Sequence, residues 1–317
     1  MSADIQQGAD TGVKVLKKIC IVFNIIILVY LSSAVFSQDQ AAFSGNEPTW
    51  LLMERGKQAY NLGEYGLASR IFREILDREG IYPDAHIWLA YIFEQEGEYT
   101  LAEKQYLYAL NEKSNLYILE DEITVLYRLA EIYRKTNQYG QYEKTLLSII
   151  SADNQSDMLN LQYSMLDSLI DYSFDKMFEL YRYEDTKYSK ARRELGIFYY
   201  RTGRYTEANI NLILPVISAA TTGFNFIYDK TADYDYYNLD LHIQNMLRYG
   251  TLRDFLDENN FFQSCYYLGA SLYAAGYNEP AYEIWRIVYK YDADTWKIRA
   301  GRQLEAPFIE PIITHRS

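Results

Sequence analysis

Cysteine is nearly absent from this chain, which has two cysteines in 317 residues. Cys20 lies inside an apolar N-terminal stretch that we expect to be removed, so Cys265 is the one thiol expected in the mature chain. A single thiol cannot form an internal disulfide, which excludes a small exported domain held together by disulfides. Stability must come from packing, and a composition that is 49% hydrophobic is sufficient for a core.

Histidine and basic charge are also scarce. The chain has 31 basic and 43 acidic side chains and a net charge of −12. This balance excludes a nucleic-acid binder, because no basic surplus is available to neutralise phosphates. The three histidines show no metal-ligand spacing; they are His86, His242 and His315. Charged residues make up 23% and aromatic residues 16%, which excludes a disordered chain.

Catalytic motifs are missing as well. The chain has no Gly-x-Ser-x-Gly elbow, phosphate-binding glycine loop or zinc-protease motif, and we predict a non-catalytic protein without metal or cofactor. Cys265 aligns with core positions of other predicted helices and is interpreted as a small buried hydrophobic residue. Three aspartates in a tyrosine-rich stretch lack the spacing of a calcium loop, which favours a solvated loop; they are Asp229, Asp233 and Asp235.

One long hydrophobic run lies near the N-terminus. Lysines precede Ile19–Leu31 and small residues follow it, the pattern of a secretory signal peptide over residues 1–37. The alternative is an uncleaved membrane anchor, because the run to Phe36 has 18 residues, near the lower limit for a span. Removal of 1–37 takes away three lysines and two aspartates and leaves a charge of −13. We expect a periplasmic or secreted protein, or one anchored in the inner membrane and facing the periplasm.

A repeated pattern with a period of 34 residues organises the rest of the chain. The motif Gly-Glu-Tyr-x-x-Ala occurs at residues 63–68 and again at 97–102, 34 positions later. Two further clear copies and one weaker copy begin at Gly203, Gly276 and Asn137. A small residue lies seven positions before each copy; these residues are Gly56, Ala90, Ala130, Gly196 and Gly269.

The pattern predicts two helices in each copy. A glycine with positive φ ends the first helix and turns the chain, and asparagine is the commonest substitute at such a place. The alanine of the motif allows the second helix to approach the small residue of the first. A bulky residue four positions later then fills the space between units; these residues are Phe72, Tyr106, Leu146, Leu212 and Trp285. No unit can bury its apolar face alone, so the units must stack.

These features resemble the tetratricopeptide repeat family, whose unit is a 34-residue helix–turn–helix. The resemblance covers five segments, namely 49–82, 83–118, 123–153, 189–222 and 262–295. It implies an all-α fold, a right-handed α-solenoid of about seven helical hairpins of which two are degenerate. The abundance of Tyr, Ile and Asn is similar to that of low-GC or spirochaetal proteins, so the chain resembles an exported bacterial repeat protein.

The spacing of the copies predicts the order of the parts. The stretches between copies have room for one further helix pair each, and Leu239–Leu256 is expected as one amphipathic helix after a loop at Thr221–Tyr237. The predicted parts are a linker 38–48, repeats at 49–153, a degenerate hairpin 154–188, a repeat 189–222, a loop and helix 223–261, a repeat 262–295, and a capping helix with an extended tail 296–317.

Tyrosine is abundant, with 33 residues. Several tyrosines lie on the stripe of the first helices that lines the concave groove in this family. Tyrosine is stiff and amphipathic, which suits recognition of an extended peptide or a partner helix. The alternative is that the superhelix folds its own terminal helix into the groove. The predicted groove residues are Lys57, Tyr60, Tyr91, Glu94, Tyr127, Arg134, Arg193, Tyr200, Arg201, Tyr266 and Tyr273.

The resemblance implies a scaffold or adaptor that binds a protein partner, and a place in an envelope, secretion or flagellar machine is the expectation. The alternative is a transporter-associated periplasmic repeat protein that binds a small hydrophobic ligand. An enzyme would require a catalytic group of residues in the insert 222–260. Membrane contact is expected only through the N-terminal segment, and the oligomeric state is left open.

Overall fold

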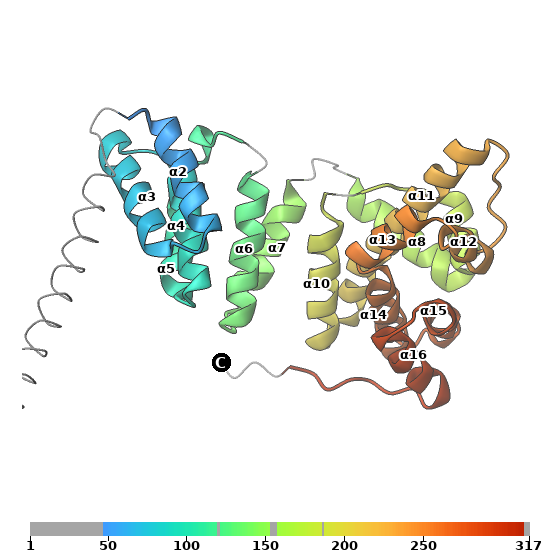
Figure 1. The fold of residues 1–317 in the computed structure, drawn as a ribbon. Coiled ribbons are helices and arrows are strands. Elements are labelled where there is room, and N and C mark those ends of the chain that lie inside the picture. The colour runs from blue at the N-terminus through green and yellow to red at the C-terminus, as the bar shows by residue number, and fades with distance from the viewer. Residues whose placement is uncertain (1–46, 119–120, 153–156, 186, 314–317) are drawn as a thin grey trace, which may run out of the picture. The chain divides into compact units, whose positions relative to one another are not determined.

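The structure is a computed structural model that describes residues 47–118, 121–152, 157–185 and 187–313. The predicted signal segment and His315 lie outside these residues. The described residues form α-helices joined by short connections, with one 3₁₀ turn at Lys113–Asn115, and the predicted all-α solenoid is confirmed (Figure 1). The chain divides into two compact units, one up to Ile92 and one from Phe93 onward.

The first unit contains α2 (Thr49–Asn61), α3 (Tyr65–Glu79) and most of α4 (Pro83–Gln95). The apolar residues of α3 recur every three or four positions, which places Ala68, Ile71, Phe72 and Ile75 on one buried face. That face packs against α2. An alanine-sized side chain at Gly56 of α2 would lie 2.6 Å from the Phe72 ring, so the close approach of the two helices requires the glycine.

The second unit contains the remaining helices. They are α5 (Tyr99–Asn111), α6 (Asp121–Lys135), α7 (Tyr139–Ser151), α8 (Met158–Asp171), α9 (Phe174–Leu180), α10 (Ser189–Arg201), α11 (Tyr205–Thr231), α12 (Leu239–Met246), α13 (Gly250–Glu258), α14 (Phe261–Ala274), α15 (Asn278–Tyr291) and α16 (Thr295–Glu305). The same close approach recurs here, because Gly196 faces Leu212 and Gly269 faces Trp285. The bulky residue thus packs against the small residue of its own repeat, a contact that the sequence pattern did not predict.

Each predicted turn between paired helices has the same hydrogen bonds. In the turn after α10, the Gly203 N–H donates to the Tyr200 carbonyl at 3.1 Å and the Arg204 N–H donates to the Tyr199 carbonyl at 2.9 Å, which is a Schellman motif. Gly203 has φ +79°, and Asn137 takes the same left-handed conformation with φ +58°. The predicted turn chemistry is therefore confirmed for the glycines and for their asparagine substitute.

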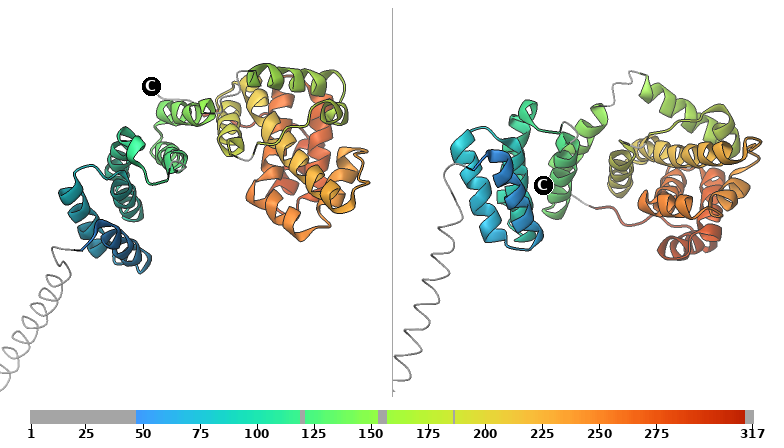
Figure 2. Two further views of the ribbon diagram at one scale, coloured as in Figure 1. Left: turned by 90° about the horizontal axis from the view of Figure 1, so that it is seen from above. Right: turned by 45° about the horizontal axis from the view of Figure 1, so that its top comes forward.

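The repeats of the second unit remain neighbours although the sequence between them is long. α7 packs directly against α10, and α10 and α11 pack against α14. The segments between repeats leave this row: α8 packs on α11, α9 contacts α15, and α12 contacts both α11 and α15. Figure 2 shows α8 in green, α11 in yellow and α14 in orange as successive layers. The helix pairs between repeats therefore form an outer layer.

The loop expected at Thr221–Tyr237 is wrong, because α11 continues without interruption to Thr231. Thr221 and Gly223 lie inside the helix, where they contact neighbouring segments. The Thr221 hydroxyl accepts the N–H of Tyr183 at 3.2 Å, and a side chain at Gly223 would lie 2.2 Å from Met246. Ala232, the residue after the end of α11, has φ +50°.

The single amphipathic helix expected at Leu239–Leu256 is also wrong, because two helices occupy this range. The chain is extended at Tyr249, with φ −101° and ψ 123°, which separates α12 from α13. The Tyr249 ring packs edge-on against Phe226 of α11, with 5.5 Å between ring centroids. This long-range contact is not visible in the local periodicity.

Among the described residues, α11 is the one helix long and apolar enough, by length and composition, to cross a membrane. Its apolar window is 78% buried inside the fold. α10 and α14 cover one part of its surface and α8 and α12 cover another. Its hydrophobicity is that of a core helix covered by these neighbours.

Candidate functional site

The predicted groove residues of the first unit gather around Trp88. The rings of Tyr60 and Tyr91 lie 5.3 Å and 5.4 Å from the Trp88 ring, both in edge-on orientation. The ammonium group of Lys57 lies 6.0 Å from the same ring. All four side chains are half-buried, so the cluster is partly accessible to solvent. Trp88 was not predicted as a groove residue, although it lies three positions before Tyr91 on the same helix face.

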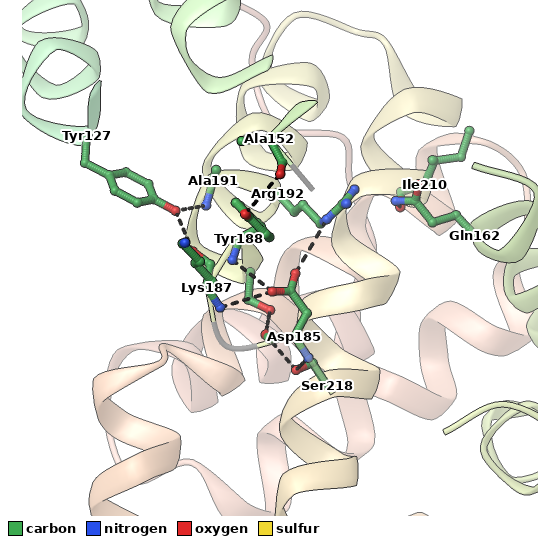
Figure 3. Close-up of polar contacts among 11 residues, drawn as sticks. Tyr127, Ala152, Gln162, Asp185, Lys187, Tyr188, Ala191, Arg192, Ile210 and Ser218 are labelled. Atoms are coloured by element: carbon green, nitrogen blue, oxygen red, sulfur yellow. Dashed lines mark hydrogen bonds and ion pairs between the residues drawn. The ribbon is translucent and has the colours of Figure 1, made fainter. Parts of the chain in front are cut away.

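Tyr127 of α6 is a hydrogen-bonding residue of the second unit. Its hydroxyl accepts the N–H of Ala191 at 3.1 Å and donates to the carbonyl of Lys187 at 3.3 Å (Figure 3). Ala191 lies in the first turn of α10, where backbone N–H groups have no partner within the helix. Burial raises the pKa of Tyr127 to about 12. The residue thus joins α6 to the start of α10.

Asp185 fixes the start of α10 from the other side. Its carboxylate Oδ1 accepts the N–H groups of Lys187 and Tyr188 at 3.1 Å and 2.8 Å, and its own N–H donates to the Ser218 hydroxyl at 2.8 Å (Figure 3). Its Oδ2 lies 3.7 Å from Nε of Arg192, and both side chains are buried. The resemblance to tetratricopeptide repeats implies an apolar residue at position 192, and this ion pair explains how the charge of Arg192 is accommodated there.

Arg193 was predicted as a groove residue, but its side chain is buried. Its guanidinium donates to the carbonyl of Asn259 at 2.7 Å and lies 3.7 Å from Glu194. Burial lowers its pKa below the ordinary arginine value. Arg193 therefore connects α10 to the segment between α13 and α14 and is not free to meet a ligand.

An open cleft lies between the hairpin α6–α7 and α10. It contains two adjoining cavities of about 490 Å³ and 430 Å³, both of which are lined by Glu131, Tyr142 and Glu194. Tyr127 and Lys190 contribute to the first cavity. The second cavity is also lined by Arg134, Tyr139, Phe198, Arg201, Tyr267 and Ile313. Three predicted groove residues, Tyr127, Arg134 and Arg201, therefore line these two adjoining cavities.

The cleft combines an aromatic wall with charges of both signs. The ring of Phe198 stacks with Tyr139 and meets Tyr142 edge-on, at centroid distances of 6.0 Å and 5.5 Å. Arg134 binds Glu131 through two hydrogen bonds of 2.9 Å and 2.6 Å. Burial raises the Glu131 pKa, but this pair outweighs it and the pKa lies below its ordinary value.

Tyr142 and Glu194, which line both cavities, are joined by a hydrogen bond. The Tyr142 hydroxyl donates to the Glu194 carboxylate at 3.0 Å, across 52 residues of sequence. Burial and the carboxylate both raise the pKa of Tyr142, so it remains protonated and a donor. Neither residue was predicted as part of the groove. Tyr142 occupies the alanine position of the weak third copy, and this departure from the repeat pattern was the available signal.

The tail after α16 lies against α10 and α14. The N–H of Glu310 donates to the Tyr200 hydroxyl at 3.1 Å, and the Tyr266 hydroxyl donates to the Glu310 carboxylate at 2.7 Å. The N–H of Ile313 donates to the Arg201 carbonyl at 2.7 Å. Tyr200 and Tyr266 are 2% and 1% exposed. They lie on the predicted stripe, but the chain's own tail covers them.

Three further predicted groove residues have contacts within the fold. Glu94 accepts a hydrogen bond from Tyr106 and lies 3.8 Å from Arg128. Tyr273 is half-buried, with its ring 5.8 Å from that of Trp285. Arg201 is exposed and donates to the Tyr267 hydroxyl at 2.9 Å. The predicted stripe thus contains exposed, cleft-lining and covered residues.

A further group of residues with shifted pKa values surrounds His242 in the insert after α11. The Nδ1 atom lies 2.7 Å from the Tyr234 hydroxyl, and Nε2 lies 2.9 Å from the Ala220 carbonyl. A carbonyl only accepts, so Nε2 carries the proton and Tyr234 donates to Nδ1. Burial lowers the pKa of His242 to about 4. Because both ring nitrogens bond within the fold and the side chain is 1% exposed, His242 connects α12 to α11.

Neither cysteine chemistry nor a metal site is found in the described part of the chain. Cys265 is buried, as predicted, and burial raises the pKa of its thiol. No group of three or more His, Cys, Asp or Glu residues that could hold a metal ion occurs among the described residues. The helices and the cleft therefore define a helical-repeat protein whose candidate site is a surface formed by neighbouring hairpins.

Comparison with known proteins shows a similarity over part of the chain to one repeat family. Residues 53–115 match the family model of the tetratricopeptide repeat. The chain is also similar to an uncharacterized protein of Borreliella burgdorferi, with 23% identity over 282 residues that cover 80% of this chain and 84% of that protein. An uncharacterized protein of Treponema pallidum is 24% identical over 230 residues, which cover 70% of this chain and 61% of that protein. The resemblance to tetratricopeptide repeats and to spirochaetal proteins is confirmed.

Proposed function

We propose that this protein is a non-catalytic scaffold that binds a partner protein through the cleft between α6–α7 and α10. Tetratricopeptide repeats suggest a protein–protein interaction scaffold. The observation that carries the proposal is the open cleft, in which two adjoining cavities share Glu131, Tyr142 and Glu194. A surface that places aromatic rings beside charged groups is suited to binding a peptide or a helix of a partner protein.

The chemistry of the cleft indicates what its partner presents. The aromatic wall of Tyr139 and Phe198 accepts an apolar side chain. Arg134 has a side chain that is 50% exposed, and Lys190 is exposed at the other end of the cleft. The lining of the two cavities has four cationic side chains, Arg128, Arg134, Lys190 and Arg201, against the two carboxylates of Glu131 and Glu194. This surplus of positive charge favours a partner segment that carries carboxylates beside apolar residues.

The envelope is the proposed location. The support is the sequence pattern of residues 1–37, where lysines precede an apolar run and small residues follow. A periplasmic or secreted scaffold in an envelope or flagellar machine is the finer form of the proposal. An inner-membrane anchor facing the periplasm is its alternative.

Crosslinking capture from the native envelope tests the function. Arg134→Glu reverses the charge of an exposed cleft residue, and Lys144→Glu makes the same change at an exposed α7 position that lines neither cavity. Both variants should keep the thermal stability of the wild-type chain to within a few degrees. A partner that is captured by wild type and Lys144→Glu, but is lost with Arg134→Glu, supports the proposal. Equal capture by all three chains contradicts it.

The transporter-associated alternative is less well supported by the cleft. A small hydrophobic ligand requires a largely apolar pocket with few polar groups. The two cavities instead share the carboxylates of Glu131 and Glu194, and Arg134 lines one of them. Co-purification of an apolar small molecule with the wild-type chain would support that alternative.

A further inference from the structure

The tail after α16 is bound to the fold as a peptide is bound to a receptor. Pro307 and Pro311 cannot donate N–H groups, and each restricts the preceding residue to extended conformations. Residues 307–313 accordingly form no helix or strand. The segment is held by its backbone and by one acidic side chain, which are the two features that recognise extended peptides.

Gln303 recognises the backbone of this segment. Its side-chain Oε1 accepts the N–H of Phe308 at 2.9 Å, and its Nε2 donates to the carbonyl of the same residue at 3.1 Å. Gln303 is 0% exposed and its Nε2 also lies 3.3 Å from the Tyr266 hydroxyl. A paired amide contact of this kind binds any residue type except proline at the Phe308 position, because it uses main-chain atoms only.

Glu310 is the anchoring side chain. Its carboxylate accepts hydrogen bonds from Arg299 and from the Tyr266 hydroxyl, and its N–H donates to Tyr200. The Arg299 guanidinium lies over the rings of Tyr266 and Trp296, at 4.6 Å and 5.0 Å from their centroids. Arg299, Gln303 and Trp296 project from one face of α16 because their spacing is three or four residues. Charge-assisted hydrogen bonds of this kind are selective for a carboxylate.

The apolar side chains of the tail are only half covered. Phe308, Ile309 and Ile312 are each 48% exposed. In contrast, the residues that bind the tail through hydrogen bonds, Tyr200, Tyr266 and Gln303, are almost completely buried. The polar groups that hold the tail are therefore more deeply buried than its apolar side chains. A segment held mainly by a few hydrogen bonds and one ion pair can leave without unfolding the helices beneath it.

We propose that Tyr200, Tyr266, Arg299 and Gln303 form a peptide-binding socket that residues 307–313 occupy in cis, and that a partner fills it with an extended segment carrying a carboxylate between bulky apolar residues. This inference rests on the proposed function and specifies its ligand. Ile313 of the tail also lines the cleft, so the socket and the cleft lie next to each other. Release of the tail would join the two surfaces.

A synthetic peptide with the sequence of residues 306–313 provides the test in the full chain. A tethered segment competes at an effective concentration of about millimolar, so the wild-type chain should bind the labelled peptide weakly. Glu310→Lys places a like charge beside Arg299 and should release the tail. We expect this variant to bind the peptide at least tenfold more tightly than wild type. The same peptide with lysine in place of its glutamate should not bind to it.

Further variants keep the test decisive. Glu310→Gln preserves the shape of the side chain and should show an intermediate gain in peptide affinity. Adding Gln303→Ala to Glu310→Lys should remove the gain. Circular dichroism and light scattering establish that each variant is folded and has the same oligomeric state as wild type. A folded Glu310→Lys chain that binds the peptide no better than wild type overturns the proposal, and so does a dimer formed by exchange of tails.

Failure of this inference is distinguishable from failure of the proposed function. The peptide experiment uses no native partner, so a negative result leaves the capture experiment with Arg134→Glu untouched. Partner capture that is insensitive to Arg134→Glu contradicts the scaffold proposal whatever the peptide does. Partner capture that rises with Glu310→Lys and is blocked by the synthetic peptide supports both.

Discussion

The hydroxyl of Tyr200 accepts the backbone N–H of Glu310 at 3.1 Å, across 110 residues of sequence. This contact places a residue of the predicted groove beneath the chain's own tail. Burial raises the pKa of Tyr200 above its ordinary value, so the hydroxyl keeps its proton. Helix α10 consequently borders the open cleft on its α6–α7 side and the covered socket on its α14 side.

Substitution of Gly269 tests the predicted close approach of paired helices. A methyl group there would lie 2.7 Å from Nε1 of Trp285, which is 0% exposed and has no room to move. Gly269→Ala should lower the free energy of unfolding by about 1–3 kcal/mol. Gly140→Ala is the matched control, because that helical glycine has nothing within 4 Å of the added methyl, and it should raise stability by up to about 1 kcal/mol. Urea denaturation of both variants measures the difference.

Removal of the Tyr127 hydroxyl tests the joint between α6 and α10. Tyr127→Phe leaves the Ala191 N–H without its 3.1 Å acceptor and should cost about 1 kcal/mol of unfolding free energy. Tyr172→Phe changes a side chain that is 73% exposed and should alter stability by less than about 0.5 kcal/mol. Equal effects of the two changes in denaturant titrations would show that the Tyr127 hydroxyl contributes nothing to the joint.

Asp185 should be one of the more sensitive positions of the second unit. Asp185→Ala removes the acceptor for two N–H groups of the α10 start and leaves the Arg192 charge buried, so we expect a loss of about 3–5 kcal/mol. Asp185→Asn retains an oxygen acceptor but loses the charge, and it should lose less. Thermal unfolding ranks the variants. An asparagine variant as unstable as the alanine variant would contradict the role given to the two N–H groups.

His242 predicts a dependence of stability on pH. Its pKa of about 4 in the folded chain lies below the ordinary value of 6.5, so the unfolded chain binds the proton more readily. Its contribution to stability is complete above pH 6.5 and is lost as the pH falls towards 4. Protonation would remove the bond from Tyr234 and place a cation near Arg182, whose charge also lowers the pKa.

Comparison of wild type with His242→Gln isolates this effect from the titration of carboxylates. Between pH 7 and pH 4, wild type should lose about 3 kcal/mol more unfolding free energy than the variant, since each pKa unit corresponds to about 1.4 kcal/mol. Urea unfolding at several pH values measures both curves. Parallel curves for the two chains would mean that His242 is not neutral and buried.

The helical hairpins were predictable because their signals are local. Gly63, Gly203 and Asn137 have the positive φ that a turn of this kind requires, and Gly196 of the first helix allows the close approach of the second helix that the pattern predicted. These features depend on neighbouring residues within one repeat. The positions of the helices between repeats depend on contacts between distant segments, such as the bond from Gln162 of α8 to the Ile210 carbonyl of α11.

The candidate site was predictable only in outline. The stripe that contains Tyr60, Tyr91 and Tyr127 follows from helical periodicity, and its role in binding remains a prediction. The burial of Tyr200 and Tyr266 could not be inferred, because it depends on where the tail lies. Pro307 and Pro311 indicated an extended tail, but no local pattern indicates the surface on which an extended segment rests.

The outer layer of helices has a consequence for how the chain folds. A simple repeat array forms contacts between adjacent units and can grow from any point along the chain. Here α7 meets α10 only after the intervening residues have closed into a long loop, and α9 meets α15 through the Phe174 N–H and Glu283, which lie 109 residues apart. Such pairings raise contact order and slow folding relative to an uninterrupted array of the same length. They also couple separate repeats, so the second unit should melt in one cooperative transition and not repeat by repeat.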